Sequence, residues 1–278
     1  MKKITRRSFL AAAGLTAAAL ALTACGGSSS STASSTASSA ASSEAASSSA
    51  AAELTTVETG KLTMATNATF PPYEMTTDTG AFEGIDVDTA QAIAEKLGLE
   101  LQIDDMEFDA ALLSVQQGKA DIVMAGVTVT DERKAVMDFS GSYATGIQSI
   151  IVPEGSDIAT PDDLAGKKIG TQRGTTGYIY CSDDFGDENV VAYDSGLTAV
   201  QALNNGQVDA VVIDNAPAKE YVAANPGLVI LDTSYAEEDY AIGMAKGSAL
   251  EDAINAALEE LKADGTLQSI VDKYITAE

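Results

Sequence analysis

Two stretches of this sequence copy one another, 88 positions apart: Ser114-Val-Gln-Gln-Gly-Lys-Ala-Asp-Ile-Val-Met-Ala-Gly126 and Ala202-Leu-Asn-Asn-Gly-Gln-Val-Asp-Ala-Val-Val-Ile-Asp214. Each begins as the tail of an amphipathic helix and continues through a Gly that can end that helix in a left-handed conformation. Each then finishes in a short apolar run, which is typical of a buried strand in a parallel sheet. The repeat predicts two related α/β halves.

The two copies differ beyond the apolar run. The first continues into Gly126-Val-Thr-Val-Thr-Asp-Glu-Arg133, whereas the second ends at Asp214. In open α/β sheets, ligands bind beyond the carboxyl ends of the strands. One half therefore offers an Arg at that place and the other offers an Asp, which is the pair needed to hold a zwitterion between two lobes.

Strand and helix patterns alternate along the whole folded part, which predicts an α/β fold. Strands are expected over 61–66, 99–103, 120–125, 149–152, 167–171, 189–193, 208–213, 228–231 and 239–245. Helices are expected over 85–97, 109–117, 196–203, 250–262 and 267–274. Two consecutive prolines, Pro71 and Pro72, exclude a helix or a central strand from the first loop.

Composition excludes several classes of function. The chain has 41 acidic and 16 basic residues, so clusters of basic side chains for nucleic acid are missing and no nucleic-acid partner is expected. It has no His, the commonest general base and a frequent metal ligand. We therefore expect no catalytic residues, no metal site and no cofactor.

The N-terminus carries an export signal. A basic start at Lys2, Lys3, Arg6 and Arg7 precedes an apolar run that ends in Leu22-Thr-Ala-Cys25. Residues 1–24 are interpreted as a signal peptide, and its ending resembles a bacterial lipobox, which implies lipidation of Cys25. The Arg6-Arg7 pair resembles a twin-arginine signal, so the general and twin-arginine export routes both stay open.

Residues 25–53 are nearly all Ser and Ala, which is the composition of a flexible linker. A lipid on Cys25 followed by this linker would hold a soluble domain at the extracytoplasmic face of the cell membrane. The second cysteine, Cys181, lies in a predicted helix and is expected to be a buried, inert thiol.

Six motifs stand in the order found in one family: Phe70-Pro-Pro-Tyr-Glu74, Gly84-Ile-Asp-Val-Asp88, Gly126 to Lys134, Asp138-Phe-Ser140, Gly174-Thr-Thr-Gly177 and Asp209 to Asp214. In this the chain resembles the extracellular solute-binding proteins, family 3, of polar-amino-acid ABC importers. The resemblance implies a two-lobed periplasmic-binding-protein type II (Venus-flytrap) fold. Lobe 1 would comprise residues 54–142 and 243–278, lobe 2 residues 148–237, and the hinges residues 143–147 and 238–242.

The resemblance also assigns roles at the carboxylate end of an amino-acid ligand. From the residues alone, Arg133 is either a bidentate carboxylate clamp or a solvated charge of the segment 131–134. The family uses the matching Arg for the ligand's α-carboxylate, with the hydroxyl of the residue matching Thr128 beside it. It likewise gives Thr175 and Thr176, at a predicted helix start, the same carboxylate, and Gln172 a polar contact.

Asp214 ends an apolar strand, where a carboxylate needs either a cation or the role of a helix N-cap. The resemblance favours a contact with the ligand's α-ammonium, helped by the Gly126 carbonyl. Phe70 and Phe108 match the aromatic pair that encloses the ligand side chain, although both could be core residues. Asn67 and Glu74 lie where side-chain selectivity is often set.

The expected function is therefore capture of a free L-amino acid and its delivery to an ABC permease, by a monomer that is not an enzyme. A polar neutral ligand is slightly favoured over basic and sulfur-containing amino acids. A sensory module that presents an amino acid to a membrane receptor stays open. So does a dehydratase resembling the cyclohexadienyl dehydratases, for which Glu74 is the only candidate acid.

Overall fold

A computed structural model describes residues 54–275, which lie within one compact unit of residues 51–278. The expected signal peptide, the lipidated Cys25 and the linker fall outside the described residues. The strands are β1 (Lys61–Thr66), β2 (Thr69–Phe70), β3 (Glu74–Thr76), β4 (Phe82–Glu83), β5 (Glu100–Asp105), β6 (Ile122–Val123), β7 (Met137–Pro153), β8 (Ile169–Gln172), β9 (Val190–Tyr193), β10 (Ala210–Asp214), β11 (Leu228–Ile230) and β12 (Ala236–Ala245). The helices are α1 (Ile85–Leu97), α2 (Phe108–Gln116), α3 (Asp131–Val136), α4 (Thr176–Phe185), α5 (Gly196–Asn204), α6 (Asn215–Ala224), α7 (Glu251–Ala263) and α8 (Thr266–Tyr274), with 3₁₀ turns η1 (Pro161–Leu164) and η2 (Asp187–Asn189).

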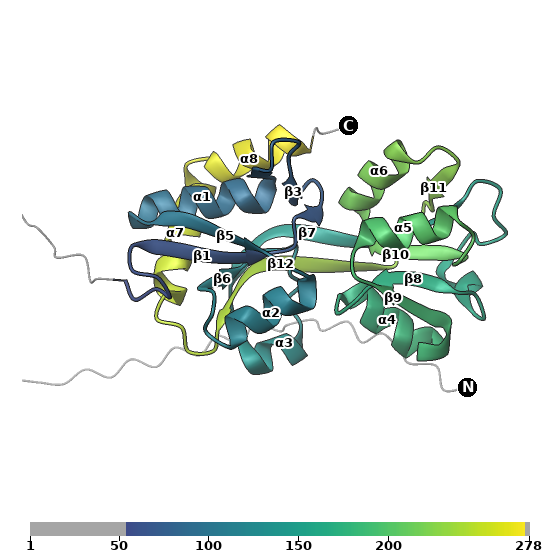
Figure 1. Cartoon of the computed structure of the whole chain (residues 1–278), viewed down its shortest axis with the longest axis horizontal. Helices are drawn as coiled ribbons and strands as arrows, with labels where there is room; N and C mark the ends of the chain where they lie inside the picture. The colour runs from purple at the N-terminus through teal and green to yellow at the C-terminus, as the bar shows by residue number, and fades with distance from the viewer. Residues whose placement is uncertain (1–53, 276–278) are drawn as a thin grey trace, which may run out of the picture. The chain divides into compact units, whose positions relative to one another are not determined.

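One sheet runs through both lobes in the order β5-β1-β6-β12-β7-β10-β8-β9, with β11 paired to β7. In lobe 1, Figure 1 shows α1 and α8 on one side of β1 and β5, and α2 on the other. Each side has its own apolar cluster, one around Leu62, Ile93 and Leu258, the other around Ala111 and Val123. In lobe 2 the sheet is likewise covered by α5 and α6 on one face and by α4 on the other (Figure 1).

Two antiparallel strands, β7 and β12, connect the lobes (Figure 1). The expected hinge ranges, 143–147 and 238–242, lie inside these strands. The register between the strands shifts at Tyr240/Ala241 and again at Ala241/Gly243. Gly146 lies opposite Glu238, and a Cβ atom at Gly146 would collide with the Tyr240 ring. Hinge ranges and lobe boundaries are defined by how one lobe moves relative to the other. They therefore stay predictions.

The structure corrects several expected elements. The first repeat strand is only β6, two residues long, because the chain turns away at Met124 to form the site. The strand expected over 149–152 is the end of the 17-residue β7. The sheet is mixed: β6 is parallel to β1 but antiparallel to β12, and β10 is parallel to β8 but antiparallel to β7. The small sheet β2-β3-β4 was not expected, and helices at the places of α3 and α6 were considered only through the alternative roles of Arg133 as a solvated charge and Asp214 as an N-cap.

Other expectations are confirmed. Helix α1 spans the expected range and ends at Gly98, which adopts a left-handed conformation with φ of 69°. Cys181 is fully buried in α4, and burial raises the pKa of its thiol to about 12, as fits an inert cysteine. Within residues 54–275 no helix has the length and apolar character to span a membrane.

Candidate ligand-binding site

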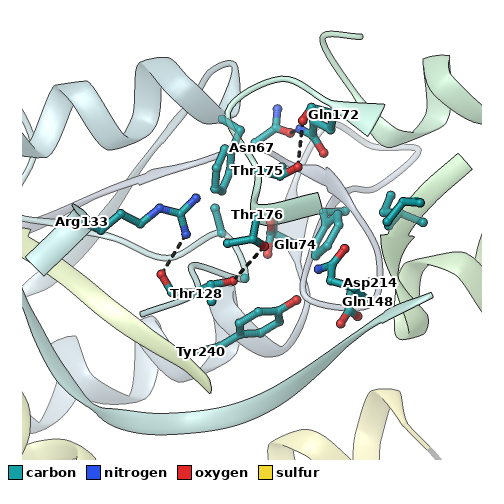
Figure 2. A pocket seen from close by; sticks show the side chains of 16 residues that line it. Asn67, Glu74, Thr128, Arg133, Gln148, Gln172, Thr175, Thr176, Asp214 and Tyr240 are labelled. Atoms are coloured by element: carbon teal, nitrogen blue, oxygen red, sulfur yellow. Dashed lines mark hydrogen bonds between the residues drawn. The ribbon is translucent and has the colours of Figure 1, made fainter. Parts of the chain in front are cut away.

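A pocket lies where the two lobes meet, with about 430 Å³ of space between its lining atoms, part of it open to solvent. Ten of the side chains or backbone positions around it are those expected from the sequence, and they come from both lobes (Figure 2). They are Asn67, Phe70, Phe108, Gly126, Thr128, Arg133, Gln172, Thr175, Thr176 and Asp214. Their contact with a ligand stays a prediction, whereas their convergence on one pocket is observed.

Arg133 marks one end of the pocket (Figure 2). It is 8 % exposed on the short helix α3, whose N-cap Thr130 accepts a hydrogen bond from the Arg133 backbone N–H. Its guanidinium donates to the carbonyl of Thr128 at 2.8 Å and to the carbonyl of Gly174, on the other lobe, at 3.1 Å. Among the described residues no carboxylate lies within salt-bridge distance of it, and burial lowers its pKa. A buried guanidinium without a nearby carboxylate is stabilised when an anion binds beside it.

Three threonines surround this end. The Thr128 and Thr176 hydroxyls lie 3.4 Å apart across the lobes, and Thr176 is the donor because the Thr128 proton goes to the Glu238 carboxylate. Thr175 caps α4: its hydroxyl accepts from the Tyr178 N–H at 3.3 Å and donates to the Gln172 carbonyl at 2.8 Å. The Thr175 proton is therefore already used, so Thr176 is the better hydroxyl donor of the pair for a ligand carboxylate.

Asp214 marks the other end (Figure 2). It is 1 % exposed and is the N-cap of α6: its carboxylate accepts from the Ala216 N–H at 2.9 Å and from the Ile147 N–H at 2.8 Å. Burial raises its pKa to about 6, although these hydrogen bonds act in the opposite direction. The helix-capping role and a cation-binding role are thus compatible, because a carboxylate has about four acceptor positions.

A second acidic group in the lining is Glu74, on β3. It is fully buried, and neither of its carboxylate oxygens has a hydrogen-bond partner of good geometry among the described residues. Burial and the neighbouring Asp86 carboxylate raise the pKa of Glu74 well above its usual value. Asp86, whose own pKa burial raises to about 6, accepts from the Gly126 N–H at 2.9 Å. This pair lies behind Gly126, whose carbonyl is the expected ammonium acceptor.

The aromatic rings divide between the two ends. Phe108 is 6 % exposed, and the Arg133 guanidinium carbon lies 5.4 Å from its ring centroid, a cation–π geometry. Phe70 stacks on Tyr73 with centroids 5.8 Å apart. A Cβ atom at Gly126 would lie 2.9 Å from the Phe70 ring, and Gly126 has a φ of 55°, so this position requires glycine.

Asn67 and Gln172 meet across the lobes. The Gln172 amide donates to the Asn67 Oδ1 at 2.8 Å, and Asn67 in turn donates to the Met106 carbonyl at 2.9 Å. Both are buried, with Asn67 5 % and Gln172 4 % exposed. This contact and three others join the two lobes, which are therefore closed on one another. The others are the Arg133–Gly174 bond, the Thr128–Thr176 contact and the bond from Tyr221 to the Thr69 carbonyl.

The sequence reasoning missed two polar residues of the lining, Gln148 on β7 and Tyr240 on β12. Both lie in the strands that connect the lobes. Gln148 interrupts the apolar end of β7, which was a usable signal, whereas Tyr240 looks like an ordinary core aromatic. Within the part of the chain described here, no group of three or more His, Cys, Asp or Glu residues could hold a metal ion.

A two-lobed α/β fold whose lobes enclose a buried cation and a buried acid defines the class of extracytoplasmic solute-binding proteins. The chain belongs to the bacterial extracellular solute-binding proteins, family 3, whose family model matches residues 62–277.

Relatives in this family are named as binding proteins for amino acids. The chain is 33 % identical to the L-cystine-binding protein TcyJ of Escherichia coli over 80 % of this chain and 85 % of that protein. It is 32 % identical to the arginine-binding extracellular protein ArtP of Bacillus subtilis, over 78 % of this chain and 87 % of that protein. The solved arginine-, lysine-, histidine-binding protein ArtJ of Geobacillus stearothermophilus superposes with a TM-score of 0.75 at 34 % identity, covering 78 % and 96 % of the two chains.

Proposed function

We propose that this protein captures a free L-amino acid between its two lobes and delivers it to an ABC importer. The observation that carries the proposal is the pair of opposite, buried charges at the two ends of one pocket, Arg133 and Asp214. A zwitterion would neutralise both at once, which offsets the desolvation of all four charges.

Each end has a defined task in this proposal. Arg133 would bind the ligand's α-carboxylate with its planar fork of donors, assisted by the Thr176 hydroxyl and the N-terminal backbone of α4. Asp214 and the Gly126 carbonyl would bind the α-ammonium. The ligand side chain would lie between Phe70 and Phe108 and end at Asn67 and Gln172, with Thr128 and Thr175 in supporting positions.

The ligand's side chain is proposed to be polar. Asn67 and Gln172 suit a polar neutral group, as the sequence favoured, because each amide both donates and accepts. A cationic side chain is the second candidate. Glu74 favours it as a further buried carboxyl group in the lining, and several relatives bear the names of arginine-binding proteins. A cation would draw the proton from Glu74, whose pKa is raised by burial.

We further propose that lipidation of Cys25 anchors the protein to the extracytoplasmic face of the membrane, with residues 25–53 as the tether, and that it acts as a monomer. Opening and closing would bend β7 and β12 near residues 143–147 and 238–242. Opening breaks the cross-lobe bonds at Gly174, Asn67 and Thr69, which a ligand must restore on closing.

The test is a thermal-shift panel of the compact unit of residues 51–278, refolded to remove carried-over ligand, against all twenty L-amino acids. A ligand at a hundred times its Kd adds about 2.7 kcal/mol to stability, which is several degrees for a chain of this size. A rise with one or a few amino acids supports the proposal and names the ligand. A flat panel refutes it.

Two alternatives predict different results. A dehydratase would use the protonated Glu74 as its acid, and it would release water from a hydroxylated ring substrate instead of only binding an amino acid. A sensory module would bind the same amino acid, but uptake would continue after deletion of this gene. Uptake that is lost with the gene supports the transport role.

A further inference from the structure

Glu238 is a buried carboxylate just behind the pocket. It lies on β12, is 6 % exposed, and does not line the pocket itself. One of its oxygens, Oε2, accepts hydrogen bonds from the Thr128 hydroxyl and from the Gln148 amide, each at 3.0 Å. Both donors do line the pocket. Glu238 therefore contacts the site through two of its members without being able to touch a ligand.

The Thr128 hydroxyl has a single proton, and Glu238 accepts it. This bond fixes the side-chain rotamer of Thr128, and the Thr128 carbonyl is in turn an acceptor for the Arg133 guanidinium at 2.8 Å. The oxygen of the Thr128 hydroxyl faces Thr176 on the other lobe at 3.4 Å. The position of Thr128 thus affects two groups at the carboxylate end of the pocket, the Arg133 guanidinium and the Thr176 hydroxyl, and Glu238 holds that position.

Glu238 also meets the second lobe. It accepts a hydrogen bond from Gln148, which belongs to lobe 2, and burial and the charge of Glu238 raise the pKa of the Tyr180 hydroxyl, on α4, to about 12. Gln148 lies on β7, next to the expected hinge. Glu238 consequently joins groups of lobe 1, lobe 2 and the connecting strands in the closed protein.

The same strand supports the opposite end of the pocket. Tyr240 is two residues further along β12, so it lies on the same face as Glu238. It is 1 % exposed, and burial together with the charge of Asp214 raises the pKa of its phenol well above the usual value. One face of β12 therefore carries the support for both charged ends of the site.

We propose that Glu238 is a positioning residue for ligand binding: its carboxylate holds Thr128 and Gln148 in the orientation that the carboxylate end of the pocket needs. This rests on the proposed function, because it concerns the same site. What matters is the reach of the side chain, since Oε2 must meet two donors at once. Its negative charge also acts on the buried Arg133, where it opposes the effect of burial on the pKa of the guanidinium. We expect this contribution to be smaller than the loss of the two hydrogen bonds.

Two substitutions separate the effect of the length of the Glu238 side chain from the effect of its charge. Glu238→Gln keeps the length, and its amide oxygen can accept from both Thr128 and Gln148 while the charge is lost. Glu238→Asp keeps the charge but withdraws the carboxylate by one methylene. We expect Glu238→Gln to raise Kd at most about threefold and Glu238→Asp to raise it about tenfold or more, the range of one lost hydrogen bond to a charged group. Glu237→Gln, on the exposed face of the same strand, is the control.

A double-mutant cycle shows whether the effect passes through Thr128. In a Thr128→Val background only the Gln148 bond remains to be lost, so Glu238→Asp should raise Kd by a clearly smaller factor than in the wild-type background. Titration calorimetry with the amino acid found in the thermal-shift panel measures each Kd, and circular dichroism checks that each variant is folded.

The outcomes are distinguishable. A wild type that responds to no amino acid refutes the proposed function and removes the ligand for which Glu238 would position the site. If the wild type binds, the positioning role requires that Glu238→Gln retain its affinity for the ligand and that Glu238→Asp bind the ligand more weakly. Any other result overturns it. An equal effect of Glu238→Asp in both backgrounds also overturns it, since Thr128 would then be uninvolved.

Discussion

The two charged ends of the pocket are built in different ways. Asp214 receives its hydrogen bonds from Ile147 and Ala216, on the strand and the helix that adjoin its own strand β10. Arg133 donates to Thr128 in one lobe and to Gly174 in the other. The hydrogen bonds of Asp214 therefore come from its own lobe and the adjoining connecting strand, whereas those of Arg133 come from both lobes. We therefore expect the contacts of the ligand's carboxylate to depend more strongly on closure than the contact of its ammonium with Asp214.

The largest expected effect is at Arg133. Arg133→Ala should weaken binding by about 2–5 kcal/mol, because the ligand's carboxylate would be buried without a partner. The ligand-free variant should melt no lower than wild type, since removing an unpaired buried guanidinium also removes its desolvation penalty. Calorimetry and thermal melting measure the two effects.

Lys134→Ala, the exposed neighbour on α3, is the matched control and should bind normally. Micromolar affinity retained in Arg133→Ala would contradict the assignment of the carboxylate end and would end the comparison between the two ends.

A smaller effect is expected at Asp214. Asp214→Asn keeps an acceptor oxygen for the Ala216 N–H, so the cap of α6 survives and only the charge is lost. Binding should weaken by about 1.5–3 kcal/mol, the range for a hydrogen bond to a charged group. Calorimetry measures it, with Asp209→Asn on the same repeat as the control. An effect larger than that of Arg133→Ala would reverse the comparison.

Much of the fold followed from periodicity and turn signals, because α1, α5, α7 and most of the strands are long enough for their apolar patterns to be unambiguous. The errors have two origins. Pattern alone cannot say which strands pair, so the repeat predicted a parallel sheet where β7 inserts antiparallel between β12 and β10. The two-residue β6 is too short to show any period.

For the site, the repeat indicated Arg133 and Asp214 because both follow apolar strands, and the family resemblance supplied the other eight residues. All ten line one pocket. Gln148, Tyr240 and Glu238 were missed, since their importance depends on β7 and β12 crossing beneath the pocket. That crossing joins residues about 90 positions apart, which a local pattern cannot reveal.

The pH dependence should sharpen the comparison, because only the acidic end titrates near neutrality. Burial raises the pKa of Asp214 and of Asp86 to about 6 each, from usual values near 3.8. A bound ammonium favours the ionised Asp214, so affinity should fall as pH drops below about 6, by up to about tenfold per unit for one proton. In the ligand-free protein, the same raised pKa values mean that the folded state binds more protons than the unfolded state between about pH 4 and 6. Its free energy of unfolding should therefore rise as the pH falls, whereas the affinity for the ligand falls.

Calorimetry from pH 4.5 to 8 measures the affinity, and thermal melting without ligand measures the stability. Tyr240 and Glu238 also act on Asp214: Tyr240, which stays protonated over this range, lowers the pKa of Asp214, and the charge of Glu238 raises it. Asp214→Asn should remove most of the slope. An affinity that is constant down to pH 5 would show that the ammonium is not held by Asp214.

The smallest effect expected is at Phe108, whose ring lies 5.4 Å from the Arg133 guanidinium carbon. Phe108→Leu keeps most of the apolar volume but removes the cation–π contact, so Arg133 should be less well oriented and binding should weaken by about 0.5–1.5 kcal/mol. Phe185→Leu, which alters an aromatic contact with Tyr235 away from the pocket, is the control for calorimetry. If Phe108 serves the basic end as well as the ligand's side chain, its effect should be smaller in an Arg133→Ala background. An undiminished effect there would mean that Phe108 acts on the ligand's side chain alone, and that the basic end depends only on the hydrogen bonds that join the two lobes.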